Sequence, residues 1–289
     1  MDIRSALHLG LQQLQQSSAD IALPHLEAQL LLSLVLQKPK EYLIAYGEEV
    51  LNDAQRQQYF DYIGQRTKGR PMAYLLGYKE FMGLNFFVDE SVLIPRDDTE
   101  VLVNYVLKHI AALSSASVLN LGTGSGCIET ILAKNNPNVQ IIGVDISKKA
   151  LTLAKKNLQL HGVEDRVTLL VSDLFSALSS IEPFDVICSN PPYISAKDMR
   201  RLSTDVLCYE PLNALYGGQD GLHFYRRIAA EAQFYLHDGG LLVLEVGSNQ
   251  SLPVIELLQK YGWLAIETNQ DLQGHIRIVS AKKQKEPIE

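Results

Sequence analysis

After residue 116 the sequence alternates short apolar runs with stretches of helical periodicity, and this alternation constrains the fold more than any other feature. Seven runs are predicted to be strands, at residues 117–121, 140–144, 167–171, 184–188, 240–246, 264–268 and 275–280. Helices are expected at about 127–135, 148–160, 221–234 and 252–261. Strands joined by single helices form βαβ crossovers, so we predict an α/β fold with a seven-stranded, mostly parallel, Rossmann-like sheet. The last two strands are too close for a helix between them and are expected to form an antiparallel hairpin.

The first 70 residues differ, because their apolar residues recur at helical spacing, as in Leu7, Leu11 and Leu14. Breaks at Pro39 and Gly47 suggest about four short helices, and Asn52 is a candidate N-cap. Residues 74–88 are aromatic and interrupted by glycines, which predicts a β-hairpin. We therefore expect a helical bundle over 1–72, a hairpin linker over 73–95 and a ligand-binding α/β domain over 96–289, opening with a helix from 97 to 110.

Composition excludes several classes of protein. The formal net charge of −7 gives no general attraction to nucleic acid, and the basic cluster at residues 66–70 is expected to be a solvated helix end and loop. Cys127, Cys188 and Cys208 are odd in number and show no CxxC spacing, which argues against disulfides and a zinc site. No apolar run is long enough to span a membrane, so we expect a cytoplasmic protein without membrane contact.

A glycine loop follows the first strand of the α/β region. Its residues are Gly122, Thr123, Gly124, Ser125 and Gly126. Glycines allow a tight turn and let a ligand approach backbone N–H groups at a helix N-terminus. Asp145, followed by Ile146, ends the second strand, where its carboxylate can accept ribose hydroxyls, and Asp173 follows the third. The G-x-G-x-G spacing lacks the dinucleotide form G-x-G-x-x-G and resembles class I S-adenosylmethionine-dependent methyltransferases.

The fourth strand ends at Asn190-Pro191-Pro192-Tyr193. Two prolines stiffen this loop at the edge of the sheet. The Asn190 side-chain oxygen and the Pro191 carbonyl could each accept one N–H of a planar NH₂ group, aiming its nitrogen at a methyl donor, while Tyr193 would pack against the flat face of the target. These four residues are the predicted catalytic element.

Further segments carry a resemblance over nearly the whole chain to the HemK/PrmC family, the release-factor glutamine methyltransferases. The matching segments are residues 93–96, 98–100, 121–126, 143–145, 172–175, 189–194, 210–211, 217–218, 220–222 and 244–245. The asparagine-proline-proline-tyrosine loop is also shared with adenine-N6 DNA methyltransferases and several RNA enzymes. The helical front domain joined by Ile94-Pro95-Arg96 is the more specific feature.

The resemblance implies N5-methylation of the glutamine in the GGQ motif of peptide chain release factors, with S-adenosyl-L-methionine as donor and S-adenosyl-L-homocysteine as product. It implies that the donor is bound by residues 122–126, Asp145, Ile146, Asp173, Leu174 and Asn190, and the glutamine by residues 190–193 and Arg96. Residues 1–72 would dock the release factor, and we expect a monomer. A ribosomal-protein glutamine methyltransferase, an N6-adenine or N2-guanine nucleic-acid methyltransferase, and a non-catalytic adaptor stay as alternatives.

Three positions depart from the family pattern. Asn120 stands where an aspartate is usual, which removes a negative charge near the methionine amino group, and Asp97 replaces a usual proline. Ile276, in His275-Ile276-Arg277, lies in a segment that is usually acidic. None of these departures touches the asparagine-proline-proline-tyrosine loop.

Overall fold

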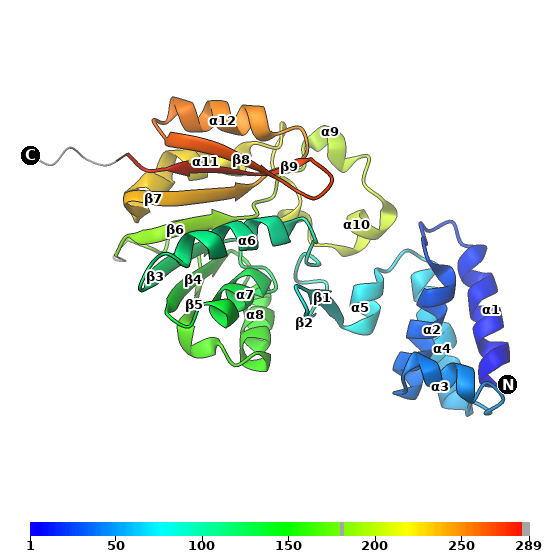
Figure 1. The fold of residues 1–289 in the computed structure, drawn as a ribbon. Coiled ribbons are helices and arrows are strands. Elements are labelled where there is room, and N and C mark those ends of the chain that lie inside the picture. The colour runs from blue at the N-terminus through cyan, green and yellow to red at the C-terminus, as the bar shows by residue number, and fades with distance from the viewer. Residues whose placement is uncertain (180–181, 285–289) are drawn as a thin grey trace, which may run out of the picture. The chain divides into compact units, whose positions relative to one another are not determined.

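The computed structural model describes residues 1–179 and 182–284, so residues 180–181 and 285–289 of the predicted 96–289 domain lie outside the described residues. The chain forms two compact units (Figure 1). The helical unit consists of Met1–Tyr78 together with Leu202–Glu210, and the α/β unit consists of Lys79–Arg201 together with Pro211–Glu289. Within the described residues, no helix has both the length and the apolar composition needed to cross a membrane.

The helical unit packs short helices around one apolar core. Its helices are α1 (Ile3–Gln15), α2 (Pro24–Leu36), α3 (Lys40–Ala45), α4 (Asp53–Arg66), α5 (Met72–Leu76) and α10 (Thr204–Tyr209). Leu31, Tyr59 and Ile63 are fully buried in that core. The predicted N-cap at Asn52 is confirmed, since its side chain accepts from the Gln55 N–H and the Gln55 side chain accepts from the Asn52 N–H. The four helices expected in the first 70 residues are present.

The expectation that residues 66–70 are solvated is wrong for Arg66, which is only 4% exposed. Its guanidinium donates to Glu27 at 2.7 Å, to Asp205 at 2.9 Å and to the Asp20 carbonyl at 3.1 Å. Burial lowers the pKa of Arg66, but the bonds and charges of Glu27 and Asp205 outweigh it and raise the pKa overall. The ion network joins the segment Leu202–Glu210 to α2 and α4, so a chain segment distant in sequence completes the helical unit.

The predicted hairpin over 74–88 is confirmed in its second part and wrong at its start. Residues 74–76 belong to helix α5, which ends at Gly77 in the left-handed region. Strands β1 (Tyr78–Phe81) and β2 (Leu84–Phe87) then pair across Met82 and Gly83, whose φ angles are 48° and 79°. Two consecutive positive φ values match the twist of a tight hairpin, and they explain the glycine at the second position.

The α/β unit contains the predicted seven-stranded sheet. Its strands are β3 (Ala116–Leu121), β4 (Val139–Asp145), β5 (Val167–Val171), β6 (Phe184–Ser189), β7 (Leu236–Glu245), β8 (Leu264–Gln270) and β9 (Ile276–Lys282). Their order is β5-β4-β3-β6-β7-β9-β8. The five strands from β5 to β7 are parallel, and β9 is antiparallel to both neighbours, which confirms the terminal hairpin.

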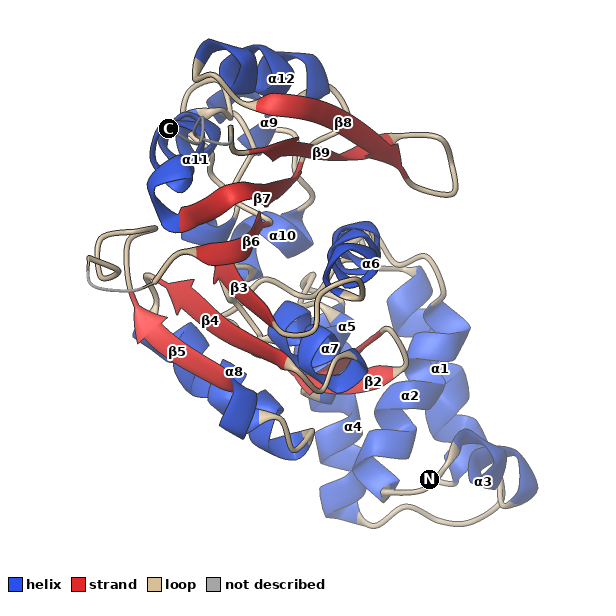
Figure 2. Ribbon diagram, turned by 60° about the vertical axis from the view of Figure 1, so that its left-hand side comes forward, coloured by secondary structure: helices blue, strands red, loops and turns tan. Residues whose placement is uncertain are grey.

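Helices cover both faces of this sheet (Figure 2). They are α6 (Thr99–Ile110), α7 (Cys127–Asn135), α8 (Lys148–Leu160), α9 (Ala196–Met199), α11 (His223–Glu231) and α12 (Ser251–Lys260), with 3-10 turns at Glu164–Arg166, Leu212–Ala214 and Ala232–Tyr235. One apolar cluster joins the sheet to α6, α7 and α8, and a second joins it to α11 and α12. Along β3, Val118 points into the first cluster and Leu119 into the second, so the strand is buried on both faces.

The strand order reverses at β3. From β3 the chain continues outward through β4 and β5, and then returns to place β6 on the other side of β3. The loops that leave β3 and β6 therefore diverge at the carboxyl edge, where open α/β sheets bind ligands. A Cβ on Gly122, after β3, would lie 3.8 Å from the Asn190 carbonyl oxygen, after β6. The topology thus brings the two predicted motifs together.

Candidate functional site

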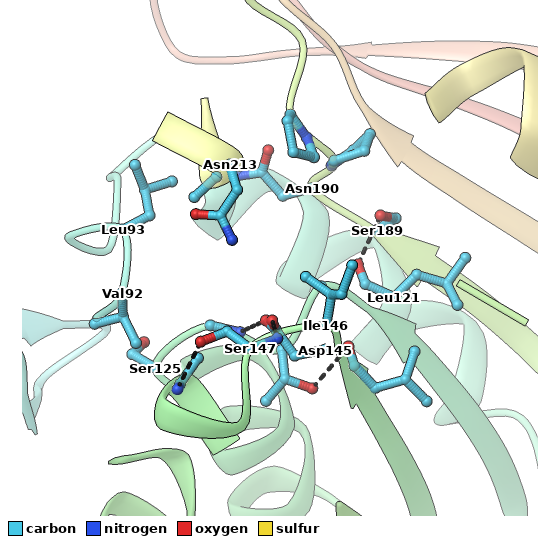
Figure 3. A pocket seen from close by; sticks show the side chains of 18 of the residues that line it. Val92, Leu93, Leu121, Ser125, Asp145, Ile146, Ser147, Ser189, Asn190 and Asn213 are labelled. Carbon is cyan, nitrogen blue, oxygen red and sulfur yellow. Dashed lines mark hydrogen bonds between the residues drawn. The ribbon is translucent and has the colours of Figure 1, made fainter. Parts of the chain in front are cut away.

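A pocket opens at this carboxyl edge, within the α/β unit (Figure 3). In the view of Figure 3, Asn190 and Asn213 lie on one side of the pocket and Ser125, Asp145 and Ser147 on the opposite side. The predicted site residues that line it are Arg96, Gly122, Thr123, Gly124, Ser125, Asp145, Ile146, Asp173, Leu174, Asn190, Pro191 and Pro192. Gly126 and Tyr193, although described, lie outside the lining.

The glycine loop adopts backbone angles that other residues avoid. The φ angles of Gly122, Gly124 and Gly126 are 86°, 55° and 79°. Gly126 is also the N-cap residue of α7, and a Cβ there would lie 3.1 Å from the Ala154 Cβ of α8. Gly126 therefore serves the close packing of α7 on α8, while Gly122 and Gly124 face the pocket.

Asp145 joins the glycine loop to the loop after β4. One carboxylate oxygen accepts from the Gly124 N–H at 2.9 Å and the other from the Ser147 N–H at 2.8 Å. Burial raises the pKa of Asp145, and the two N–H donors oppose that rise. Each oxygen keeps a second lone pair, so the carboxylate can still accept hydroxyl groups of a ligand such as a ribose. Ile146 beside it is 61% exposed and offers apolar surface to a flat ring.

The loop after β5 places Asp173 and Leu174 in the pocket lining. Asp173 accepts from the Arg227 guanidinium of α11 at 2.9 Å, which leaves its other oxygen for a ligand. Leu174 has a φ of 50°, an uncommon angle for a residue with a side chain, and its carbonyl accepts from the Ser172 hydroxyl at 2.7 Å. Such backbone strain is often found at ligand sites, and here Ser172 helps to hold it.

The loop after β6 is fixed at both ends. The Ser189 hydroxyl donates to the Leu121 carbonyl at 2.7 Å, and the Tyr193 carbonyl accepts from Gln250 Nε2 at 2.8 Å. Between them the Asn190 Nδ2 group donates to Thr99 Oγ1 at 3.1 Å. The Tyr193 ring packs against the cluster under α11 and α12, where burial raises the pKa of its hydroxyl to about 12.

Comparison with known proteins agrees with this geometry. Residues 5–77 match the family described as the PrmC N-terminal domain, and residues 97–219 match the Methyltransferase small domain. The "Release factor glutamine methyltransferase" of Clostridium acetobutylicum is 39% identical over 97% of this chain and 98% of its own length. The relative of the same name in Geobacter sulfurreducens is 42% identical over 89% of each chain.

The chain belongs to the release factor glutamine methyltransferase family. The resemblance noted from the sequence motifs is thereby confirmed. The family also occurs within longer proteins, because the chain spans 54% of the "Bifunctional methyltransferase" of Rickettsia bellii at 36% identity. Among solved structures, a "Methyltransferase from Pyrococcus furiosus" has a TM-score of 0.53 at 18% identity, covering 71% of this chain and 92% of its own, which supports the fold.

Asn120, the first of the departures from the expected family pattern, has a defined partner in the structure. Asn120 is fully buried, and its Nδ2 group donates to Glu129 of α7 at 2.7 Å. Burial raises the pKa of Glu129 to about 7, against bonds from Asn120 and Thr123. An aspartate at position 120 would set a second carboxylate against Glu129, whereas asparagine donates a hydrogen bond to it. Asparagine at position 120 thus stabilises a buried carboxyl group that contacts Thr123 of the glycine loop.

The other two departures from the family pattern lie near the start of α6. Asp97 accepts from Lys79 at 3.1 Å, and Ile276 packs at the edge of the apolar cluster under α11 and α12. Its neighbour Arg277 pairs with Asp98 at 3.0 Å and with Asp271 at 2.8 Å. The terminal hairpin, to which the sequence assigned no role, therefore holds Asp98, the residue before Thr99, through an ion pair.

Sequence analysis missed several pocket residues. Thr99, Asn213 and Phe224 line the pocket, and Glu245 lies behind it in contact with Thr99. Thr99 and Glu245 fall within segments that match the family, so a signal existed, but their spacing in sequence gave no hint that they meet. Asn213 lies in the 3-10 turn Leu212–Ala214 and Phe224 in α11, and neither carries a motif of its own.

Proposed function

We propose that this chain is a protein-(glutamine-N5) methyltransferase that modifies the glutamine in the GGQ motif of peptide chain release factors, using S-adenosylmethionine as the methyl donor. The main support is the 39% identity over 97% of the chain to a relative named as a release factor glutamine methyltransferase. The asparagine-proline-proline-tyrosine loop beside the glycine loop is the feature that fits this chemistry.

The pocket suits the donor. The backbone of Gly122 and Gly124 is assigned to the methionine part of the donor, and the Asp145 carboxylate to the ribose. The apolar side chains of Ile146 and Leu174 are assigned to the flat purine. When bound, S-adenosylmethionine supplies an electrophilic methyl group on a sulfonium. Asp173 is assigned to the exocyclic amine of the purine through the oxygen that Arg227 leaves available.

Asn190 and Pro191 are assigned to the substrate. The lone pair of an amide nitrogen is delocalised, so the nitrogen is a weak nucleophile unless its N–H groups are held. Asn190 and Pro191 line the same pocket. The Asn190 side-chain oxygen accepts one N–H of the substrate amide, and the Pro191 carbonyl accepts the other. Pro192 stiffens the loop, and Tyr193, whose partly buried ring packs against the cluster under α11 and α12, is assigned to pack against the flat face of the target amide. Arg96, also in the lining, is assigned to the substrate backbone.

Residues 1–72 are assigned to docking of the release factor, and the protein is proposed to act as a monomer. This separate helical unit carries the match to the PrmC N-terminal domain. The net charge of −7 favours a protein substrate over a nucleic acid, because a polyanion would be repelled.

The test is incubation with S-adenosylmethionine and a purified release factor, followed by mass spectrometry of the tryptic peptide that contains the glutamine. One added methylene on that glutamine is expected. Asn190→Ala is expected to lower turnover by about 100-fold or more and to lower donor affinity, measured by calorimetry, far less. Asn138→Ala, at an exposed position before β4 on the opposite edge of the sheet, is the matched control. An unmodified peptide in the wild-type reaction would refute the substrate assignment.

A further inference from the structure

The Asn190 side chain has two different ends, and the proposed reaction needs its oxygen to face the substrate. The Nδ2 group donates to Thr99 Oγ1 at 3.1 Å. Thr99 is 4% exposed, so we expect its hydroxyl to donate its own proton to a protein acceptor. The identity of that acceptor decides which way the hydrogen bond runs.

The acceptor is Glu245, the last residue of β7. Glu245 is 2% exposed, and a side-chain hydrogen bond with Thr99 is among the influences that lower its pKa, which places the two side chains next to each other. Among the described residues, its Oε2 atom has no hydrogen-bond partner. An ionised carboxylate can only accept, so Thr99 must donate to Glu245 and can only accept from Asn190.

We propose that Glu245 and Thr99 form a hydrogen-bond relay that sets the orientation of the Asn190 amide, with its nitrogen held inside and its oxygen presented to the substrate. This inference rests on the proposed function and names two positioning residues for it. Thr99 begins α6 and Glu245 ends β7, so the relay ties the loop after β6 to two neighbouring elements. The direction of the relay depends on the charge of one buried carboxyl group.

Burial raises the pKa of Glu245 to about 7, although the Thr99 hydrogen bond opposes this. The charged or titratable groups that face Glu245 are Asp98, which raises its pKa, Arg277 and Arg96, which lower it, and the hydroxyls of Tyr193 and Tyr225. A protonated Glu245 carries a donor of its own and no longer dictates the direction of the Thr99 bond. Orientation of Asn190 is therefore expected to be lost as the pH falls through about 7.

Substitution of Thr99 is the first test. Thr99→Val keeps the shape but removes the hydroxyl, and kcat for glutamine methylation is expected to fall about tenfold or more, with the donor Kd nearly unchanged. Thr99→Ser is expected to restore kcat. Thr152→Val, on the exposed face of α8, is the matched control. Wild-type kcat in Thr99→Val, or no recovery in Thr99→Ser, would overturn the relay.

The pH profile is the second test. In the wild type, kcat is expected to rise with a single ionisation near pH 7. Glu245→Gln retains an acceptor oxygen for Thr99 but cannot ionise, so it should keep activity above pH 8 within a few-fold and lose the ionisation. The same ionisation in Glu245→Gln and Thr99→Val as in the wild type would contradict the proposal.

A nuclear magnetic resonance measurement separates failure of the relay from failure of the proposed function. The side-chain NH₂ signals of Asn190, assigned by their loss in Asn190→Asp, are expected to shift with a midpoint near pH 7 in the wild type but not in Glu245→Gln. If the wild type methylates no release factor, the proposed function is wrong, but the titration of these signals still tests the relay. Signals that do not titrate in the wild type would overturn it.

Discussion

Asp145→Asn is expected to weaken binding of S-adenosylmethionine by about 10- to 100-fold. The carboxylate accepts the Gly124 N–H at 2.9 Å with one oxygen and the Ser147 N–H at 2.8 Å with the other. Asparagine has a single acceptor oxygen, so its NH₂ group must face one of these N–H donors. One charge-assisted bond, worth ~1.5–3 kcal/mol, is lost, and the glycine loop is released at that point.

The expected 10- to 100-fold weakening of donor binding follows from the loss of this hydrogen bond, because each ~1.4 kcal/mol changes a dissociation constant tenfold. Titration calorimetry with S-adenosylmethionine measures it directly. Asp185→Asn is the matched control, since Asp185 also accepts a backbone N–H, that of Ser117, at 2.8 Å, but near the amino end of β3. The reasoning would be refuted if Asp145→Asn bound the donor as the wild type does, or if Asp185→Asn weakened binding equally.

Two further predictions concern stability. Arg66→Ala is expected to destabilise the helical unit by about 3–5 kcal/mol, because Glu27 and Asp205 lose their buried cation, whereas Arg56→Ala, at an exposed pair, should cost about 0–1 kcal/mol; urea denaturation compares them. The raised pKa of Glu129, about 7 against an ordinary value of 4.5, means that the folded protein binds more protons than the unfolded chain between those values, so its stability should fall as the pH rises through this window. Glu129→Gln should remove that component, worth at most about 3 kcal/mol at pH 8, and unchanged pH dependence of the melting temperature would contradict it.

The sequence predicted the sheet well because most strands of the seven-stranded sheet contain a short apolar run. Residues 127–135 and 148–160 were predicted to be helical with the bounds that α7 and α8 have. The error at residues 74–76 arose because Tyr74-Leu75-Leu76 has no polar residue to mark a helix, and its single turn is ended only by Gly77. One turn is too short for its period to be distinguished from that of a strand.

Side-chain partners were harder to predict than elements. The bonds from Asn190 to Thr99 and from Arg66 to Asp205 join residues 91 and 139 positions apart. No local pattern encodes such pairs, since they exist only after strands and helices have assembled. Most motif residues of the pocket could be predicted from the sequence because they lie at or directly after the end of a strand, at the same edge of the sheet.

The segment Leu202–Glu210 has a consequence for the exchange of parts between relatives. It leaves the α/β unit after Arg201, supplies α10 to the helical unit and returns at Pro211. A chimaera that swaps only the first 78 residues would separate Arg66 from the Asp205 with which it pairs. The helical unit is therefore built from two separate stretches of the chain. A chimaera that takes Met1–Tyr78 from a relative should also take that relative's counterpart of the nine residues Leu202–Glu210.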